Sequence, residues 1–132
     1  MNIIIDSNIF ISALIKDSTT RKLITNYKYN FLLPEYGLEE ILSNKDEILK
    51  KSKLSEKDFY ILLLRILKYI QIIPSDLIIK FWKQADEIIG DIDKGDSAFV
   101  ATALAFDCPI WSDDKHFQAQ DEIIIYTTRD MI

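Results

Sequence analysis

Short apolar runs alternate with longer amphipathic segments along this chain, an order that is typical of α/β proteins. Five runs have the length and composition of buried strands, and they cover residues 2–5, 31–33, 71–73, 109–112 and 123–126. The segments between them carry apolar residues at helical spacing. Because β-helix-β crossovers are right-handed and join parallel strands, the pattern predicts a mainly parallel sheet that is covered by helices.

Helices are expected in the intervening segments, at residues 9–15, 18–27, 34–51, 55–70, 74–89 and 96–106. Pro34 suits the first position of a helix, because the N–H that proline lacks would be unpaired there. Ser55 resembles a helix cap, and Gly90 is expected to end the helix that precedes it. Alanines at 98, 101, 103 and 105 allow the last long helix to pack closely on the sheet.

The composition fits one globular domain over residues 1–132, with 48% hydrophobic and 28% charged residues. The apolar stretches are interrupted by charges well before the roughly 20 residues that a membrane span needs. The N-terminus lacks the basic region of a secretory signal. Cys108 is the only cysteine, so no internal disulfide can form, and we expect a cytoplasmic protein.

Four carboxylates follow predicted strands or lie in the first turns of the helices after them: Asp6, Glu40, Asp96 and Asp114. In a parallel sheet these places converge on one edge. Converging carboxylates repel one another, and burying them unpaired costs several kcal/mol each or forces some to protonate. A divalent cation that binds the carboxylate oxygens neutralises their charge and removes that cost. The sequence therefore predicts a metal site that cleaves phosphodiesters.

Several assignments stay open on the residues alone. Each of Asp6 and Asp96, taken singly, could be a helix cap. Asp113 and Asp114 are adjacent, and spacing does not decide between them; Glu39 and Glu40 pose the same ambiguity, with Glu40 the weaker choice. Ser112 is expected to hydrogen-bond a carboxylate. His116, a lone imidazole near the surface, is not assigned a catalytic role.

The net charge of −5 would argue against a nucleic-acid partner, but five of the acids lie near the proposed metal site. Without Glu40 and the four aspartates at 6, 93, 96 and 114, the formal charge is zero. Seven of the sixteen basic residues lie between positions 45 and 68. They form either a surface that contacts a phosphate backbone or, more commonly, a solvated helix face.

Four motifs, in order, resemble a PIN domain. They are Ile-Asp-Ser-Asn-Ile-Phe at 5–10, Leu-Glu-Glu-Ile at 38–41, Asp-Ser-Ala-Phe-Val-Ala-Thr-Ala at 96–103 and Trp-Ser-Asp-Asp-Lys-His-Phe at 111–117. Together they cover nearly the whole chain. The resemblance implies a three-layer α/β/α fold with a central parallel sheet of four to five strands. It also implies Mg²⁺- or Mn²⁺-dependent ribonuclease activity.

Carried over by position, Asp6, Glu40, Asp96 and Asp114 match the acidic quartet of the family, which binds metal and is catalytic. Ser112 stands two residues before the fourth acid, as a small hydroxyl residue does in similar proteins, and this favours Asp114 over Asp113. An acid just before an aliphatic residue likewise favours Glu40 over Glu39.

Supporting roles are also expected around the quartet. Asp93 is expected to be a further metal ligand or to contact a ligand without binding the metal itself. Asn8 is expected to orient Asp6 or a metal-bound water. His116 departs from the family pattern, because many relatives carry an acid at this position.

The resemblance implies an endonuclease that hydrolyses RNA, similar to the VapC-type toxins of toxin–antitoxin pairs. A small antitoxin and a homodimer are then expected partners, with no membrane. A non-catalytic PIN-like module would bind RNA or protein without cutting. An enzyme that forms an aspartyl phosphate fits poorly. The Asp-Ser-Asn turn lacks both the paired acids of response regulators and the Asp-x-Asp motif of haloacid-dehalogenase-like proteins.

Overall fold

The computed structural model describes residues 1–26, 28–90 and 94–132. Five strands form one sheet in the order β3-β2-β1-β4-β5, and every neighbouring pair is parallel. The strands are β1 (Asn2–Ile5), β2 (Asn30–Pro34), β3 (Ile70–Ile73), β4 (Ile110–Trp111) and β5 (Ile125–Tyr126). The expected parallel sheet of four to five strands is confirmed.

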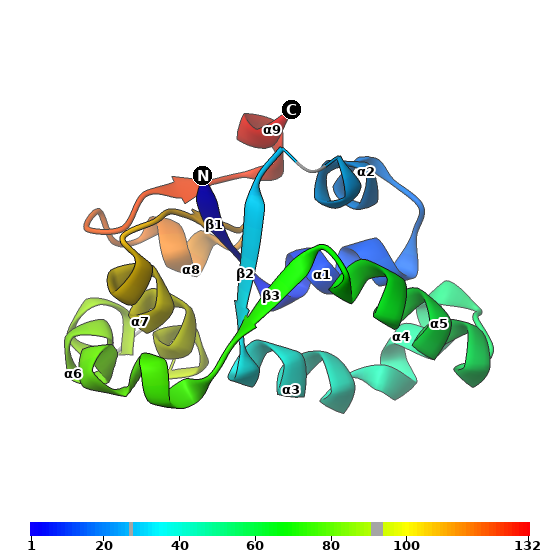
Figure 1. Ribbon diagram of the computed structural model, residues 1–132, viewed down its shortest axis with the longest axis horizontal. Coiled ribbons are helices and arrows are strands. Elements are labelled where there is room, and N and C mark those ends of the chain that lie inside the picture. Colours follow the sequence, from blue (N-terminus) through cyan, green and yellow to red (C-terminus); the bar gives the residue numbers. More distant parts are fainter. Residues whose placement is uncertain (27, 91–93) are drawn as a thin grey trace.

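Helices cover the sheet on both sides, which confirms the expected three-layer arrangement (Figure 1). On one side lie α1 (Ser7–Ile15), α2 (Thr19–Thr25), α4 (Lys45–Ser52) and α5 (Glu56–Leu67). On the other lie α6 (Trp82–Ala85), α7 (Ser97–Phe106) and α8 (Lys115–Gln118). Helix α3 (Glu35–Ser43) leaves the carboxyl end of β2, and α9 (Thr128–Met131) ends the chain. Each helix in the described ranges is too short or too polar to cross a bilayer.

The core lies on both faces of β1, where Ile3, Ile4 and Ile5 are all fully buried. A strand covered by helices on both faces has no polar side, which explains the continuous apolar run in the sequence. Helix α7 packs directly on the sheet, and its small residues from Ala98 to Ala103 are buried. Phe99 of this helix contacts Phe117 of α8 edge-on, with ring centroids 6.2 Å apart.

The prediction of one helix over residues 34–51 is wrong. Pro34 is the last residue of β2, and the helix begins at Glu35. It ends at Ser43, and α4 starts after Asn44, whose side chain donates a hydrogen bond to the Glu40 carbonyl at 2.8 Å. Asparagine competes with the helix in this way by bonding the backbone locally, so the segment divides into two helices.

The prediction of one helix over residues 74–89 is also wrong. This segment holds two 3₁₀ turns (Ser75–Leu77 and Ile79–Phe81), the short α6 and a π-helix (Asp86–Gly90). Gly90 is the last described residue before a gap at 91–93, so its predicted role in ending a helix stays a prediction. Helix α5 stops at Leu67, so Ile70 belongs to β3, and β4 and β5 have two residues each. Ser55 caps α5 as predicted and accepts a hydrogen bond from the Asp58 N–H.

Strand β1 lies between β2 and β4, so the chain leaves it toward one edge of the sheet and later returns to its other side. Open α/β sheets have their ligand crevice at such a reversal, beyond the carboxyl ends of the strands. The residues that follow β1 and β4 therefore lie next to each other. These residues include Asp6, Ser112 and Asp114.

Candidate metal centre

Asp6 follows β1 directly and is only 4% exposed. Burial raises the pKa of its carboxyl group to about 6, and the negative charge of Asp114 acts in the same direction. The Ser112 hydroxyl opposes this shift by donating a hydrogen bond to Asp6 Oδ2 at 2.7 Å. Burial therefore dominates, and the ionised form of Asp6 is less favourable in the folded protein than in water.

Ser112 joins the ends of the two central strands. Its hydroxyl bonds Asp6 beyond β1, and its oxygen accepts a hydrogen bond from the Asp114 N–H at 3.0 Å. Ser112 itself is fully buried. This arrangement agrees with the expected contact between Ser112 and a carboxylate, and it fixes the backbone of Asp114 relative to Asp6.

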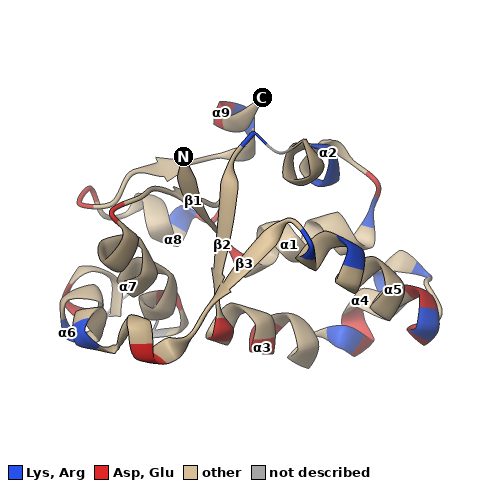
Figure 2. Cartoon of the chain, viewed as in Figure 1, with Lys and Arg blue, Asp and Glu red and all other residues tan. Residues whose placement is uncertain are grey.

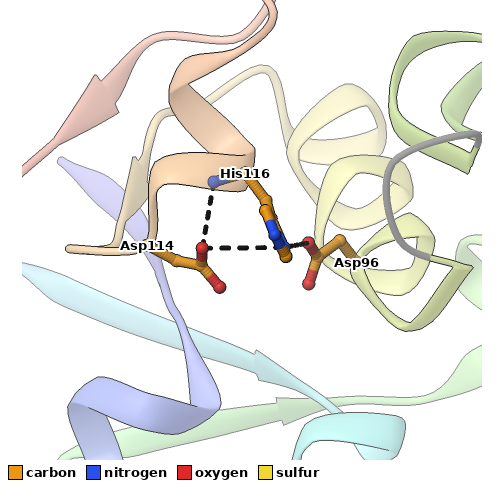
Figure 3. A group of neighbouring side chains, drawn as sticks. All are labelled: Asp96, Asp114 and His116. Atoms are coloured by element: carbon orange, nitrogen blue, oxygen red, sulfur yellow. Dashed lines mark hydrogen bonds and ion pairs between the residues drawn. The ribbon is translucent and has the colours of Figure 1, made fainter.

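Asp114, Asp96 and His116 form a compact group across the loop after β4 and the start of α7 (Figure 3). Each offers one ligand atom, and these atoms lie within 4.8 Å of one another. His116 Nδ1 is 3.7 Å from Asp114 Oδ1 and 3.9 Å from Asp96 Oδ2. Asp114 caps α8 and accepts the His116 N–H at 2.9 Å.

Glu40 reaches the same edge of the sheet from α3. The hydroxyl of Ser7, the residue after Asp6, donates a hydrogen bond to Glu40 Oε1 at 3.2 Å. Glu40 is half-buried, whereas Glu39 is exposed. Asp6 and Glu40 are not members of the group of three around His116. The four predicted acids thus form two linked parts, which meet through Ser112 and Asp114.

Adjacent aspartates after β4 have opposite surroundings. Asp113 binds Thr128 at the start of α9, where its oxygens accept the backbone N–H at 2.7 Å and the hydroxyl at 2.6 Å. Trp111 Nε1 donates to the same hydroxyl at 3.0 Å. Asp113 therefore anchors the C-terminal helix, and Asp114 faces Asp96.

The structure does not test the supporting roles expected of Asn8 and Asp93. Asn8 is exposed, and with Asp114 it lines an open hollow of about 260 Å³. Asp93 lies outside the described residues. The role expected of each in the site stays a prediction.

Sequence reasoning missed two residues of this edge. His116 was set aside as a lone imidazole, yet its ring lies between two of the predicted acids. Its place two residues after Asp114, in the first turn of the same helix, was the available signal. Ser7 was not singled out, although a hydroxyl next to Asp6 can reach a neighbouring element.

A divalent cation fits this donor set. Two carboxylates and an imidazole offer oxygen and nitrogen atoms within 4.8 Å of one another, which is slightly wider than the spacing of ligands around a single ion. Asp6, whose charge is disfavoured by burial, lies beside them through Ser112 and adds a charge that a cation would stabilise.

The basic residues between 45 and 68 lie on a different part of the molecule, on and around α4 and α5 (Figure 2). They are interleaved with acids. Lys45 Nζ is 3.0 Å from Glu56 Oε1, and Lys51 Nζ is 3.0 Å from Glu47 Oε1. These two pairs fit the interpretation as a solvated helix face.

Comparison with solved structures supports the fold. The crystal structure of VapBC2 from Rickettsia felis, bound to a DNA fragment from their promoter, superposes with a TM-score of 0.74. The match covers 96% of this chain and 98% of that chain, at 17% sequence identity. At this identity the likeness concerns the fold. No curated protein matches the sequence.

A protein-family model identifies the family independently of the structure. The model describes the PIN domain, and it matches residues 4–131. The resemblance seen in the four sequence motifs is therefore confirmed. Because the model spans nearly the entire chain, the protein belongs to the PIN domain family.

Proposed function

We propose that this protein is a divalent-metal-dependent endoribonuclease that hydrolyses RNA phosphodiester bonds. The observation that carries the proposal is the convergence of Asp96, Asp114 and His116 beside the buried Asp6, at the carboxyl edge of a PIN-domain sheet. Such a convergence of like charges destabilises the folded protein, although Asp114 also caps α8. It suits a protein that binds a cation there.

Asp6, Asp96 and Asp114 are the proposed ligands of Mg²⁺ or Mn²⁺, together with Glu40. Such an ion, when bound, supplies Lewis-acid stabilisation of the charge that develops on phosphate oxygens. The chain itself holds the acids in place. Ser112 orients Asp6, and the His116 N–H holds Asp114 Oδ1.

Glu40 has a separate proposed task. Its carboxylate is half-buried and accepts a hydrogen bond from the Ser7 hydroxyl, and it is not one of the three donors around His116. From there it can accept a hydrogen bond from the water that attacks phosphorus, or it can bind metal directly.

We further propose that the protein is the toxin of a cytoplasmic toxin–antitoxin pair. The similarity in fold to the VapBC2 complex from Rickettsia felis supports this proposal. The surface supports a protein partner or a homodimer as well, since Tyr60, Ile61 and Leu64 of α5 are exposed. Purification together with the product of a neighbouring gene tests for an antitoxin. Sedimentation of the purified chain tests for a homodimer.

The experiment that tests catalysis is cleavage of a pool of structured and single-stranded RNAs with Mn²⁺, Mg²⁺ or EDTA. Wild type is compared with Asp96→Asn. Asp107→Asn is the matched control, because it makes the same charge change at the other end of α7. Asp107 has a left-handed backbone conformation (φ 49°), which asparagine tolerates.

We expect metal-dependent cutting by wild type and by Asp107→Asn, and none by Asp96→Asn or in EDTA. Absence of cutting by a folded wild-type protein with metal bound would contradict the proposal. That result would favour the alternative of a non-catalytic module that binds RNA or protein.

A further inference from the structure

We propose that His116 is a direct nitrogen ligand in this metal site, and that its imidazole favours Mn²⁺ over Mg²⁺. This inference rests on the proposed function, because it presumes that a divalent ion binds at Asp96 and Asp114. It adds a ligand that the acidic quartet does not include. It also names the residue that sets the choice of ion.

The geometry of the imidazole supports direct ligation. Two ligands that each lie about 2.1 Å from one ion can be no more than about 4.2 Å apart. His116 Nδ1 satisfies this limit toward both carboxylates, at 3.7 Å from Asp114 Oδ1 and 3.9 Å from Asp96 Oδ2. Figure 3 shows the nitrogen side of the ring between the two carboxylates.

The local structure holds the ring in this position. Asp114 is the N-cap of α8, and His116 is in the first turn of that helix. The 2.9 Å hydrogen bond from the His116 N–H to Asp114 Oδ1 fixes the backbone of one residue against the side chain of the other. Phe117, the next residue, is fully buried against Phe99 of α7, the helix that Asp96 precedes.

The three donors also differ in exposure in a way that suits an ion at the surface. Asp96 Oδ2 is fully buried and forms the inner wall of the group. The His116 side chain is 51% exposed and forms the outer wall. An ion can therefore reach the group from the solvent side, where His116 is exposed, with Asp96 on the buried side.

The kind of donor determines which ion is preferred. Mg²⁺ is hard, takes oxygen ligands and demands a near-ideal octahedron. Imidazole is a softer donor that transition-metal ions accept more readily. Replacing an oxygen ligand by a nitrogen ligand therefore lowers the affinity for Mg²⁺ more than the affinity for Mn²⁺.

The test exploits the fact that His116 is the only histidine. Tag-free wild type is loaded with Mn²⁺ and examined by electron spin echo envelope modulation, which detects ¹⁴N coupled to the ion. Affinities for Mn²⁺ alone, and for Mg²⁺ by competition, follow from the electron paramagnetic resonance signal of free Mn²⁺. The variants are His116→Asp and His116→Gln. Lys115→Gln, an exposed neighbour, is the control for charge.

We expect histidine ¹⁴N modulation in wild type and in Lys115→Gln, and its loss in both His116 variants. The ratio of Mn²⁺ to Mg²⁺ affinity should fall about tenfold in His116→Asp, where an oxygen donor replaces nitrogen. Lys115→Gln should change both affinities alike and leave their ratio unchanged. Circular dichroism of each variant checks that the fold is intact.

Bound Mn²⁺ without nitrogen coupling would overturn the role of His116 while leaving the carboxylate site and the nuclease proposal in place. An unchanged affinity ratio in His116→Asp would overturn the role in ion choice. No Mn²⁺ binding by folded wild type would overturn the metal site itself, and with it this inference.

Discussion

The acidic edge of the sheet and the surface of α4 and α5 are both rich in charge, but they use it in opposite ways. At the edge, charges of one sign converge, and Asp6 is buried with its pKa raised to about 6. On α4 and α5, charges of both signs alternate in solvent and pair at 3.0 Å. The first arrangement destabilises the protein until something binds, whereas the second is nearly neutral in energy.

This contrast shows which charges have a function. Exposed pairs contribute little, and their number says little about binding. Convergent, buried charges of like sign persist only where another property depends on them. Removal of the buried Asp6 charge should therefore alter stability and activity in opposite directions, while changes on α4 and α5 should alter neither by much.

The largest effect is expected from Asp6→Asn. Cleavage with Mn²⁺ should fall by at least about a hundredfold, since changes that only support metal ligands already cost 10–100-fold. Without metal, the variant should be more stable than wild type by about 1–3 kcal/mol, because the buried charge is gone. Cleavage rates and urea unfolding in EDTA measure the two effects. A variant that cuts normally, or is less stable, would contradict this account of Asp6.

The pH dependence of stability should reveal the same carboxyl group. Its folded pKa of about 6 lies above the ordinary value of 3.8, so the folded state holds the proton more tightly than the unfolded state. The contribution of Asp6 to stability is therefore greatest below about pH 4, and it falls as pH rises to about 6, by up to about 3 kcal/mol.

Urea unfolding in EDTA at several pH values, with wild type compared against Asp6→Asn, isolates this contribution from other acids. The advantage of the variant should grow from near zero at pH 4 to its full size above pH 6. A difference that does not change with pH would show that Asp6 titrates normally.

A smaller effect is expected from Ser112→Ala. The change removes the 2.7 Å hydrogen bond to Asp6 and the acceptor for the Asp114 N–H. Stability should fall by about 1–3 kcal/mol, because the Asp114 N–H loses its partner. The pKa of Asp6 should rise further, so cleavage should need a higher pH. A pH profile of cleavage that matches wild type would argue against Ser112 as the residue that orients Asp6.

The smallest effect is expected on α4. A double-mutant cycle with Glu47→Gln and Lys51→Gln should give a coupling energy below about 0.5 kcal/mol, since both side chains are exposed. Cleavage should stay near the wild-type rate in both single variants. A large loss of cleavage in Lys51→Gln with the fold intact would instead indicate that this surface contacts RNA.

Much of the fold could be predicted from the sequence, because buried strands and packed helices leave strong patterns. The run at Ile3–Ile5 and the alanines of α7 are examples, and both are buried as expected. The break at Asn44 depends on one side chain bonding a carbonyl, which apolar spacing does not show. The turns of residues 75–90 keep Ile78, Ala85 and Ile89 buried without forming a regular helix. The spacing of apolar residues alone cannot distinguish a regular helix from a series of short turns that buries the same side chains.

The candidate site was predictable to a similar degree. Topology placed Asp6 and Asp114 at one edge, since both follow central strands of a parallel sheet. Spacing alone does not decide between Asp113 and Asp114, whereas the family resemblance favours Asp114; in the structure Asp113 instead binds Thr128 at the start of α9. The nearness of His116 to Asp114 could be inferred from their two-residue spacing, but its distance from Asp96 depends on how α8 packs beside α7.

The central claim is that this acidic edge binds a divalent ion in order to cleave RNA. The most direct test measures Mn²⁺-dependent RNA cleavage by Asp114→Asn and Asp113→Asn side by side, with thermal unfolding of each as a check on folding. The two changes remove the same charge from adjacent residues. We expect Asp114→Asn to lose cleavage and Asp113→Asn to keep it while becoming less stable. Equal activity of the two folded variants would contradict the account.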